Sequence, residues 1–225
     1  MRQHELLTNL KSKPNDEFYT PFETVKYIFE KFPKSIFSGK ILYCPADNPN
    51  WSQFAYYLMR EFDSLKLKQL IISYHSPYFA QYNLFEINSA ERPKVTIINR
   101  GIIANADIPQ SELLAKLLEL PENKQYLANC NMSLLSGEAL ELLKYCDIVA
   151  TNPPFSLLTE YYRKIKQYGK DFILIMPLLN ACRYLPLDNI SIFKIRRKFK
   201  GPQGEQKMAR GAFAPTPSIF LKKKN

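Results

Sequence analysis

The chain has 225 residues, of which 46% are hydrophobic, and its formal net charge at pH 7 is +10. That length predicts one domain with enough apolar residues for a buried core. No apolar run approaches the length of a membrane span, and residues 1–13 are too polar for a secretory signal. We therefore expect a cytoplasmic protein rather than a secreted or integral membrane protein.

The positive charge is concentrated at the carboxyl end. Residues 190–225 contain ten Lys or Arg and one acidic residue, so this end carries +9 of the total of +10. A basic end on a nearly neutral body is typical of proteins that bind a polyanion. A tail that only aids solubility is the alternative, but basic and apolar residues interleave from 193 to 200, which favours a folded strand-like surface. The candidate nucleic-acid contacts are Arg196, Arg197, Lys198, Lys200, Lys207 and Arg210.

Cysteine and histidine give no sign of a metal site. The four cysteines are scattered without CxxC spacing, and there are only two histidines. We therefore expect reduced thiols and no bound metal.

The first predicted elements are a helix, a strand and a second helix. Thr20-Pro21 predicts a helix start, with Thr20 near the cap, and apolar residues recur at helical spacing from Phe22 to Phe32. Residues 40–44 predict a short buried strand. The helix after it is expected to present one apolar face, formed by Trp51, Phe54, Ala55, Leu58 and Phe62.

The loop at 45–49 lies between this strand and helix, where a nucleotide-type ligand can bind. It lacks the glycines of a GxGxxG loop, so the sequence gives no dinucleotide fingerprint. Asp47 and Asn48 have side chains that can bind a hydroxyl or ammonium group of a ligand. Without further context, capping of the following helix is the simpler interpretation of both residues.

Strand and helix signals alternate along the rest of the chain. Residues 95–98 are candidates for a hairpin with 102–103, and 200–217 is expected to be a long basic loop. Further strands are predicted at 70–73, 172–176, 190–194 and 218–221, and helices at 113–118, 138–145 and 157–168, the last ending at Gly169. This alternation predicts a single three-layer α/β domain over residues 1–225 with a mainly parallel central sheet.

The most informative segment is Asp147 to Phe155. Residues 148–150 read as a buried parallel strand, and Pro153-Pro154 cannot continue it, because proline lacks a donor and fixes φ. The chain therefore leaves the sheet at Asn152, at the carboxyl end of a strand, where open α/β sheets bind ligands. Ser156 is a candidate cap for the helix that follows.

This segment brings together groups that suit the exocyclic amine of a flat base. The Asn152 carboxamide and the Pro153 carbonyl can each accept one N–H bond, which favours a tetrahedral nitrogen with a free lone pair. The ring of Phe155 can stack on a base taken out of its helix. The alternative is an ordinary Asn-Pro turn without catalytic meaning.

Four segments, in this order, resemble the adenine-specific DNA methyltransferases of the EcoRI-methylase type, which use S-adenosylmethionine. The resemblance covers roughly residues 16–181, with gaps. The segments are Asp16 to Pro21, Tyr43 to Pro49 with Ser52 and Phe54, Asp147 to Ser156, and Asp171 to Ile175 with Asn180-Ala181.

The resemblance implies a Rossmann-like methyltransferase fold and methyl transfer to the N6 amine of a flipped adenine in DNA. It implies S-adenosylmethionine as the cofactor. The implied catalytic residues are Asn152, Pro153, Pro154 and Phe155. Together with the loop analysis, the cofactor residues are Phe18, Tyr19, Thr20, Pro21, Asp47, Asn48 and Pro49.

Two features depart from the family pattern. The turn at 129–133 contains no acidic residue, where the family usually has one, and the chain ends soon after its last predicted strand. Sequence specificity would then come from a short target-recognition loop at 200–217 within the basic part 190–225, from the insert near 77–130, or from a protein partner. Two other functions stay open: a methyltransferase acting on RNA or a protein amide, and an inactive nucleic-acid-binding relic.

Overall fold

The computed structural model describes residues 20–75, 92–102, 108–154 and 156–177, and the backbone of four later strands. Its helices are α2 (Phe22–Phe29), α3 (Gln53–Arg60), α4 (Gln110–Leu118), α5 (Gly137–Tyr145) and α6 (Leu158–Gln167). Its main strands are β1 (Ile41–Cys44), β2 (Gln69–Ser73), β3 (Lys94–Ile98), β4 (Lys124–Leu127), β5 (Ile148–Thr151), β6 (Asp171–Pro177), β7 (Ile190–Lys194) and β10 (Pro217–Lys222). The predicted helices and nearly all of the predicted strands are present, with bounds shifted by a few residues.

The main strands form one sheet in the order β4-β3-β2-β1-β5-β6-β10-β7. Strands β1, β2, β5 and β6 are joined by parallel pairings, whereas β3 and β10 pair antiparallel with both of their neighbours. Six of the eight strands therefore run in one direction, which confirms the mainly parallel sheet. The carboxyl ends of β1, β2, β4 and β5 lie along one edge.

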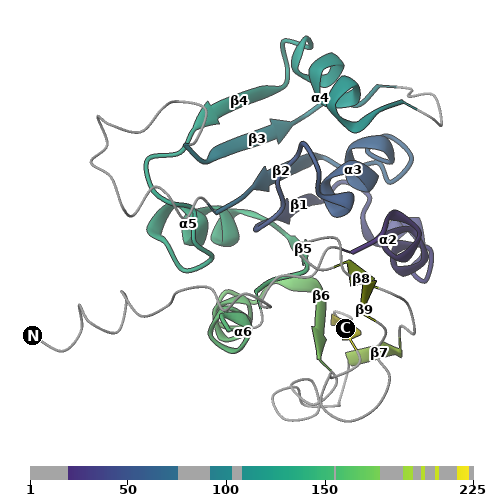
Figure 1. The fold of residues 1–225 in the computed structure, drawn as a ribbon, viewed down its shortest axis with the longest axis vertical. Coiled ribbons are helices and arrows are strands. Elements are labelled where there is room, and N and C mark those ends of the chain that lie inside the picture. The colour runs from purple at the N-terminus through teal and green to yellow at the C-terminus, as the bar shows by residue number, and fades with distance from the viewer. Residues whose placement is uncertain are drawn as a thin grey trace, which may run out of the picture.

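The sheet is covered by helices on both faces, as the three-layer prediction requires. Figure 1 shows α2, α3 and α4 on one side of the strands and α5 and α6 on the other. Successive side chains of a strand point to opposite faces. Leu42 and Cys44 of β1 accordingly pack in the core beneath α2, α3 and α4, whereas Ile41 and Tyr43 pack in the core beneath α5 and α6.

Several local predictions were wrong. β3 pairs with β2 and β4, which leaves no place for a hairpin with residues 102–103. Trp51 is 47% exposed and precedes α3, because Ser52 is the N-cap of that helix. Pro21 is the N-cap of α2, so Thr20 lies next to the cap as predicted, whereas the N-cap of α6 is Leu157 rather than the predicted Ser156.

The basic end contains one pairing that was not predicted. β7 covers Ile190–Lys194, as expected, and residues 195–198 of the strand-like segment 193–200 lie outside the described residues. A separate short ladder pairs β8 (Phe199–Lys200) with β9 (Gln206–Lys207), and β9 lies inside the segment expected to be loop. The C-cap prediction for α6 was right: Gly169 follows the helix with a φ of 64°, in the left-handed region that glycine adopts at little cost.

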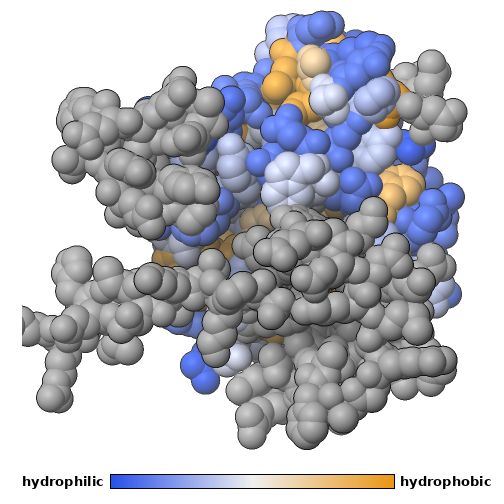
Figure 2. All heavy atoms as spheres, viewed as in Figure 1, coloured by the Kyte–Doolittle hydropathy of each residue, from blue (hydrophilic) through white to orange (hydrophobic). Residues whose placement is uncertain are grey.

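The described surface is mainly polar. Figure 2 shows mostly hydrophilic residues over β4, α4 and α3, with isolated hydrophobic areas between them. Small, separated apolar areas are ordinary on a globular protein. None of the described helices combines the length and the apolar character needed to cross a lipid bilayer.

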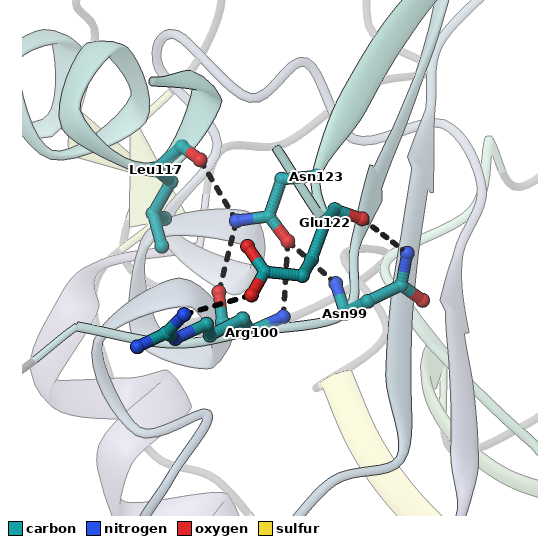
Figure 3. A network of polar contacts seen from close by, with 5 residues as sticks. All are labelled: Asn99, Arg100, Leu117, Glu122 and Asn123. Carbon is teal, nitrogen blue, oxygen red and sulfur yellow. Dashed lines mark hydrogen bonds and ion pairs between the residues drawn. The ribbon is translucent and has the colours of Figure 1, made fainter. Parts of the chain in front are cut away.

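At the sheet edge opposite the carboxyl ends, the buried side-chain amide of Asn123 forms hydrogen bonds to neighbouring segments (Figure 3). Asn123, just before β4, accepts hydrogen bonds from the backbone N–H groups of Asn99 and Arg100 at 2.7 and 2.9 Å. Its Nδ2 donates to the carbonyls of Arg100 and Leu117 at 2.9 and 2.8 Å. All four hydrogen-bonding positions of the amide are used, so Asn123 joins the end of β3 to the end of α4.

Replacing Asn123 by Ala should therefore lower the free energy of unfolding by about 2–4 kcal/mol, because buried backbone groups lose their partners. Asn99→Ala is the matched control, since that side chain is exposed and its bonds lie at the surface; it should cost less than about 1 kcal/mol. Urea unfolding of both variants measures the difference. Equal losses in the two variants would contradict the role given to Asn123.

Candidate active site

The site lies where β1 and β5 run side by side. These strands pair in parallel, with Leu42 opposite Ile148 and Tyr43 opposite Val149. The helix after β1 covers one face of the sheet and the helix after β5 covers the other. The chain therefore departs in opposite directions from two neighbouring strands, and this topological switch point is where open α/β sheets bind ligands. At this point Thr151, the last residue of β5, contacts Pro45 and Asp47 of loop 45–52.

Asp47 is held at the switch point by three other segments. Its backbone N–H donates to the carbonyl of Ser73, at the end of β2, at 2.9 Å. Its Oδ1 accepts a hydrogen bond from the Ser52 hydroxyl at 2.5 Å, and its Oδ2 accepts one from the Thr151 hydroxyl at 2.7 Å. The side chain is only 5% exposed.

The interpretation of Asp47 as a helix cap was wrong. Ser52 caps α3, since its Oγ accepts a hydrogen bond from the N–H of Ala55 at 3.4 Å. Asp47 instead binds the hydroxyl of that cap. Its two carboxyl oxygens thus connect the start of α3 to the end of β5.

Burial of the Asp47 carboxyl raises its pKa to about 7, an effect that the hydrogen bonds from Ser52 and Thr151 partly offset. The ionised form loses its hydration in this position, so the proton is retained to a higher pH than in water. Near neutral pH a large fraction of the molecules therefore carries a neutral Asp47.

A side chain of α4 also forms hydrogen bonds to loop 45–52. The side-chain Nε2 of Gln110 donates to the carbonyls of Pro49 and Ser52 at 2.8 and 2.9 Å. Asn48, half-buried in the same loop, accepts from the backbone and side-chain nitrogens of Asn50, which forms a local turn. Strands β2 and β5 and helix α4 thus all fix the loop, although it lacks the glycines of a dinucleotide loop.

Asn152 leaves the sheet directly after Thr151, as the double-proline break predicted. The residue is half-buried rather than in the core, with its carboxamide oxygen shielded from solvent. Pro153 is buried, and the carbonyl of Pro154 accepts from the N–H of Leu157 at 3.1 Å, which closes a turn into α6. Phe155 lies outside the described residues.

Thr151 is the residue of this site that the sequence analysis missed. It is fully buried, and its hydroxyl lies 2.7 Å from Asp47 Oδ2 and 2.5 Å from the carbonyl oxygen of Pro45. The only signal available was a hydroxyl-bearing residue at the last position of a buried strand, immediately before Asn152.

The arrangement is thus an acidic loop after the first strand of the sheet, linked to an Asn-Pro-Pro turn after its parallel neighbour. A family model described as adenine-specific methyltransferase EcoRI matches residues 6–209. The chain belongs to this family.

Individual relatives agree with that membership. The chain is 29% identical over 195 residues to type II methyltransferase M.EcoRI of Escherichia coli, a match that covers 83% of this chain and 52% of that protein. It is 31% identical over 165 residues to M.MpnI of Mycoplasma pneumoniae and 25% identical over 166 residues to M.MgeORF184P of Mycoplasma genitalium. These matches cover 73% of this chain and 41% and 42% of the two proteins. The chain spans about half the length of these EcoRI-family relatives or less, and no solved structure matches it.

The remaining predicted site residues are only partly described. Phe18 and Tyr19 lie outside the described residues, as do Arg196, Arg197, Lys198 and Arg210. Lys200 and Lys207 lie on β8 and β9, of which only the backbone is described. Their assigned roles stay predictions.

Thr20 and Pro21 lie at the start of α2, next to α3. The ring of Phe22 lies 5.4 Å from the ring of Tyr56 and 6.0 Å from that of Tyr57, so the start of α2 packs on the helix that follows loop 45–52. Thr20 is buried, and its hydroxyl has no hydrogen-bond partner within the described ranges. A buried polar atom of this kind is costly unless a ligand or another part of the chain binds it.

The turn at residues 129–133, after β4, has no acidic residue of its own, but the carboxylate of a residue in α5 binds it. Glu138, in the first turn of α5, reaches back to accept a hydrogen bond from the N–H of Asn129 at 3.0 Å. A ring nitrogen of His75, just after β2, lies 2.9 Å from the carbonyl oxygen of Asn131 in the same turn. A carboxylate therefore contacts this turn, although the turn itself contains no acidic residue.

The raised pKa of Asp47 predicts a specific pH dependence of stability. Since this carboxyl holds its proton to about pH 7 when folded and to about 3.8 when unfolded, the folded form binds more protons between these values. The free energy of unfolding should fall as the pH rises from 4 to 7, by about 1.4 kcal/mol for each unit of pKa difference. Asp47→Asn, which mimics the neutral carboxyl, should lack this decline.

Urea unfolding of both proteins from pH 5 to pH 8 measures the effect as the difference between variant and wild type, so that all other titrating groups cancel. The advantage of Asp47→Asn should grow up to about pH 7 and then stay constant. A difference that does not change with pH would show that Asp47 is not buried as described.

Proposed function

We propose that this protein is an S-adenosylmethionine-dependent methyltransferase that modifies the exocyclic N6 amine of adenine in DNA. The observation that carries the proposal is the link between Asp47 and Thr151, which places Asn152 beside loop 45–52 at the switch point of the sheet. Family membership supplies the class of reaction.

The chemistry of the described residues fits the cofactor. Thr20 offers a buried hydroxyl that lacks a partner in the described part of the chain, and Asp47 offers a carboxyl at the end of β1. A cationic group bound beside Asp47 would favour its ionised form and lower its pKa. When bound, the cofactor supplies a methyl group on a positively charged sulfur. The residues proposed to hold it are Phe18, Tyr19, Thr20, Pro21, Asp47, Asn48 and Pro49.

Asn152 and the Pro153 backbone are proposed to prepare the acceptor. An adenine amine is a weak nucleophile, because its lone pair is delocalised into the ring. Hydrogen bonds from its two N–H groups to the Asn152 carboxamide and the Pro153 carbonyl would favour a tetrahedral nitrogen. The rigid Pro153-Pro154 backbone, of which Pro153 is buried, would keep one acceptor in a fixed position, so little reorganisation would be needed during the reaction. Phe155 is proposed to stack on the adenine after it leaves the double helix.

DNA is proposed as the partner because positive charge is concentrated in residues 190–225. Contacts from basic side chains to phosphates provide affinity without sequence preference. The proposed contacts are Arg196, Arg197, Lys198, Lys200, Lys207 and Arg210. Recognition of a particular sequence is proposed to come from loop 200–217, from the segment 77–130 or from a protein partner.

The decisive variant is Asn152→Ala. With labelled S-adenosylmethionine and DNA, the rate of methyl transfer should fall at least about 100-fold, because one preorganised acceptor is removed. Cofactor affinity, measured by calorimetry, should change little. Asn99→Ala, at the opposite edge of the sheet, should transfer methyl groups at the wild-type rate.

The same assay distinguishes the other functions. Wild-type protein that methylates RNA or a protein in preference to DNA would keep the chemistry and change the substrate. Wild-type protein that binds no S-adenosylmethionine and modifies none of these acceptors would overturn the proposal in favour of an inactive nucleic-acid-binding protein. Methylation-sensitive sequencing of DNA from cells that make the protein would then identify the recognition sequence.

A further inference from the structure

The end of β5 is joined to β1 by a side chain rather than by the backbone. The parallel pairing of these strands covers Leu42 with Ile148 and Tyr43 with Val149. On the other side of β5, pairing with β6 continues as far as Thr151 opposite Leu174. At the level of Thr151, the connection to the β1 side is made by its hydroxyl, which reaches Pro45 and Asp47.

We propose that Thr151 is a positioning residue for methyl transfer: its hydroxyl fixes the distance between Asn152 and loop 45–52. The inference rests on the proposed function, because it assigns the loop to the cofactor and Asn152 to the acceptor amine. Thr151 itself is not assigned a contact with the cofactor or with the acceptor amine. It acts through Asp47 and Pro45 on one side and through its peptide bond to Asn152 on the other.

The position of Thr151 makes this role sensitive to small changes. The residue is fully buried, so water does not replace a lost hydrogen bond. A shift of about 1 Å between reacting groups can cost about 100-fold in rate. The partners of Thr151 lie 104 and 106 residues away in the chain, so its hydroxyl extends the contact between these distant segments beyond the paired part of β1 and β5.

The Thr151 hydroxyl can form the bridge in both protonation states of Asp47. When Asp47 is ionised, the single hydrogen of the hydroxyl lies within hydrogen-bonding distance of two acceptors, Asp47 Oδ2 and the carbonyl of Pro45. Donation to the carboxylate stabilises the ionised form and so lowers the pKa of Asp47. When Asp47 carries its proton on Oδ2, that proton can be donated to Thr151 Oγ1, and the Thr151 hydrogen to the carbonyl of Pro45.

Other titratable groups do not alter this conclusion. The side chains of the described part that interact electrostatically with Asp47 are the thiol of Cys44 on β1 and the phenol of Tyr161 on α6. Burial raises the pKa of both groups well above its ordinary value, so both are neutral around pH 7. Ser52, the remaining hydrogen-bond partner of the carboxyl, does not titrate in this range.

Two variants of the full chain test the proposal. Thr151→Val keeps the shape and loses only the hydroxyl, whereas Thr151→Ser keeps the hydroxyl and loses a methyl group. We expect kcat to fall about 10- to 100-fold in the Val variant, with the affinity for S-adenosylmethionine changed less than about 3-fold, and kcat to return to within about 3-fold of wild type in the Ser variant. Loss of kcat and affinity in proportion, or failure of Ser to restore the rate, would overturn the proposal.

A second readout does not depend on activity. The hydrogen bond from Thr151 lowers the pKa of Asp47, so Thr151→Val should move the Asp47 transition in the stability–pH curve to higher pH, and Thr151→Ser should leave it in place. An unmoved transition in the Val variant would overturn the bridge. Should wild type transfer no methyl group to any acceptor, the proposed function fails, whereas this titration still decides whether the bridge exists. Should Thr151→Val fail to fold, a Ser variant with low kcat or a moved transition would overturn the proposal.

Discussion

The buried carboxyl group of Asp47 is the interaction on which the site depends. Its oxygens bind the hydroxyls of Ser52 and Thr151, and its backbone N–H binds the end of β2 at Ser73. The ends of β2 and β5 and the start of α3 are therefore all linked to this one residue. Without the carboxyl group, the hydrogen bonds that link loop 45–52 to other described segments would include those of Gln110 from α4, the Thr151–Pro45 contact and the backbone bond from Asp47 to Ser73.

This interaction costs stability, and the rest of the fold offsets that cost. Removing a carboxylate from water is unfavourable, as the raised pKa of Asp47 reflects. Two apolar cores, one on each face of the sheet, surround the strands that carry the site. At the opposite edge, the Asn123 amide satisfies all of its hydrogen bonds and links β3 to α4. Departures from the most stable arrangement thus occur at the proposed active site, as expected for a functional region.

The sequence was sufficient to predict the elements that have strong local signals. The buried run before Pro153-Pro154 gave β5 and the exit of the chain at Asn152, and the amphipathic pattern before Gly169 gave α6. It did not reveal β4, because this edge strand reads Lys-Gln-Tyr-Leu and its side chains are exposed or half-buried, so no apolar pattern marks it. Trp51 was placed on the buried face of a helix, but the helix begins only after Ser52.

The contacts of the site were not predictable from the sequence for a different reason. A hydrogen bond between Asp47 and Thr151 joins residues 104 positions apart and leaves no local pattern. Asp47 was interpreted as a helix cap because aspartate often caps helices, while the true cap, Ser52, lies five residues later. The carboxylate of Glu138 likewise reaches a turn nine residues earlier in the chain, where the local sequence has no acid.

A double-mutant cycle between Asp47 and Thr151 tests the central claim most directly. The free energy of unfolding is measured by urea titration for wild type, Asp47→Ala, Thr151→Val and the double variant. If the hydroxyl of Thr151 binds the carboxyl of Asp47, the two effects should be non-additive by about 1 kcal/mol or more. Effects that add to within about 0.3 kcal/mol would contradict the link between the two loops.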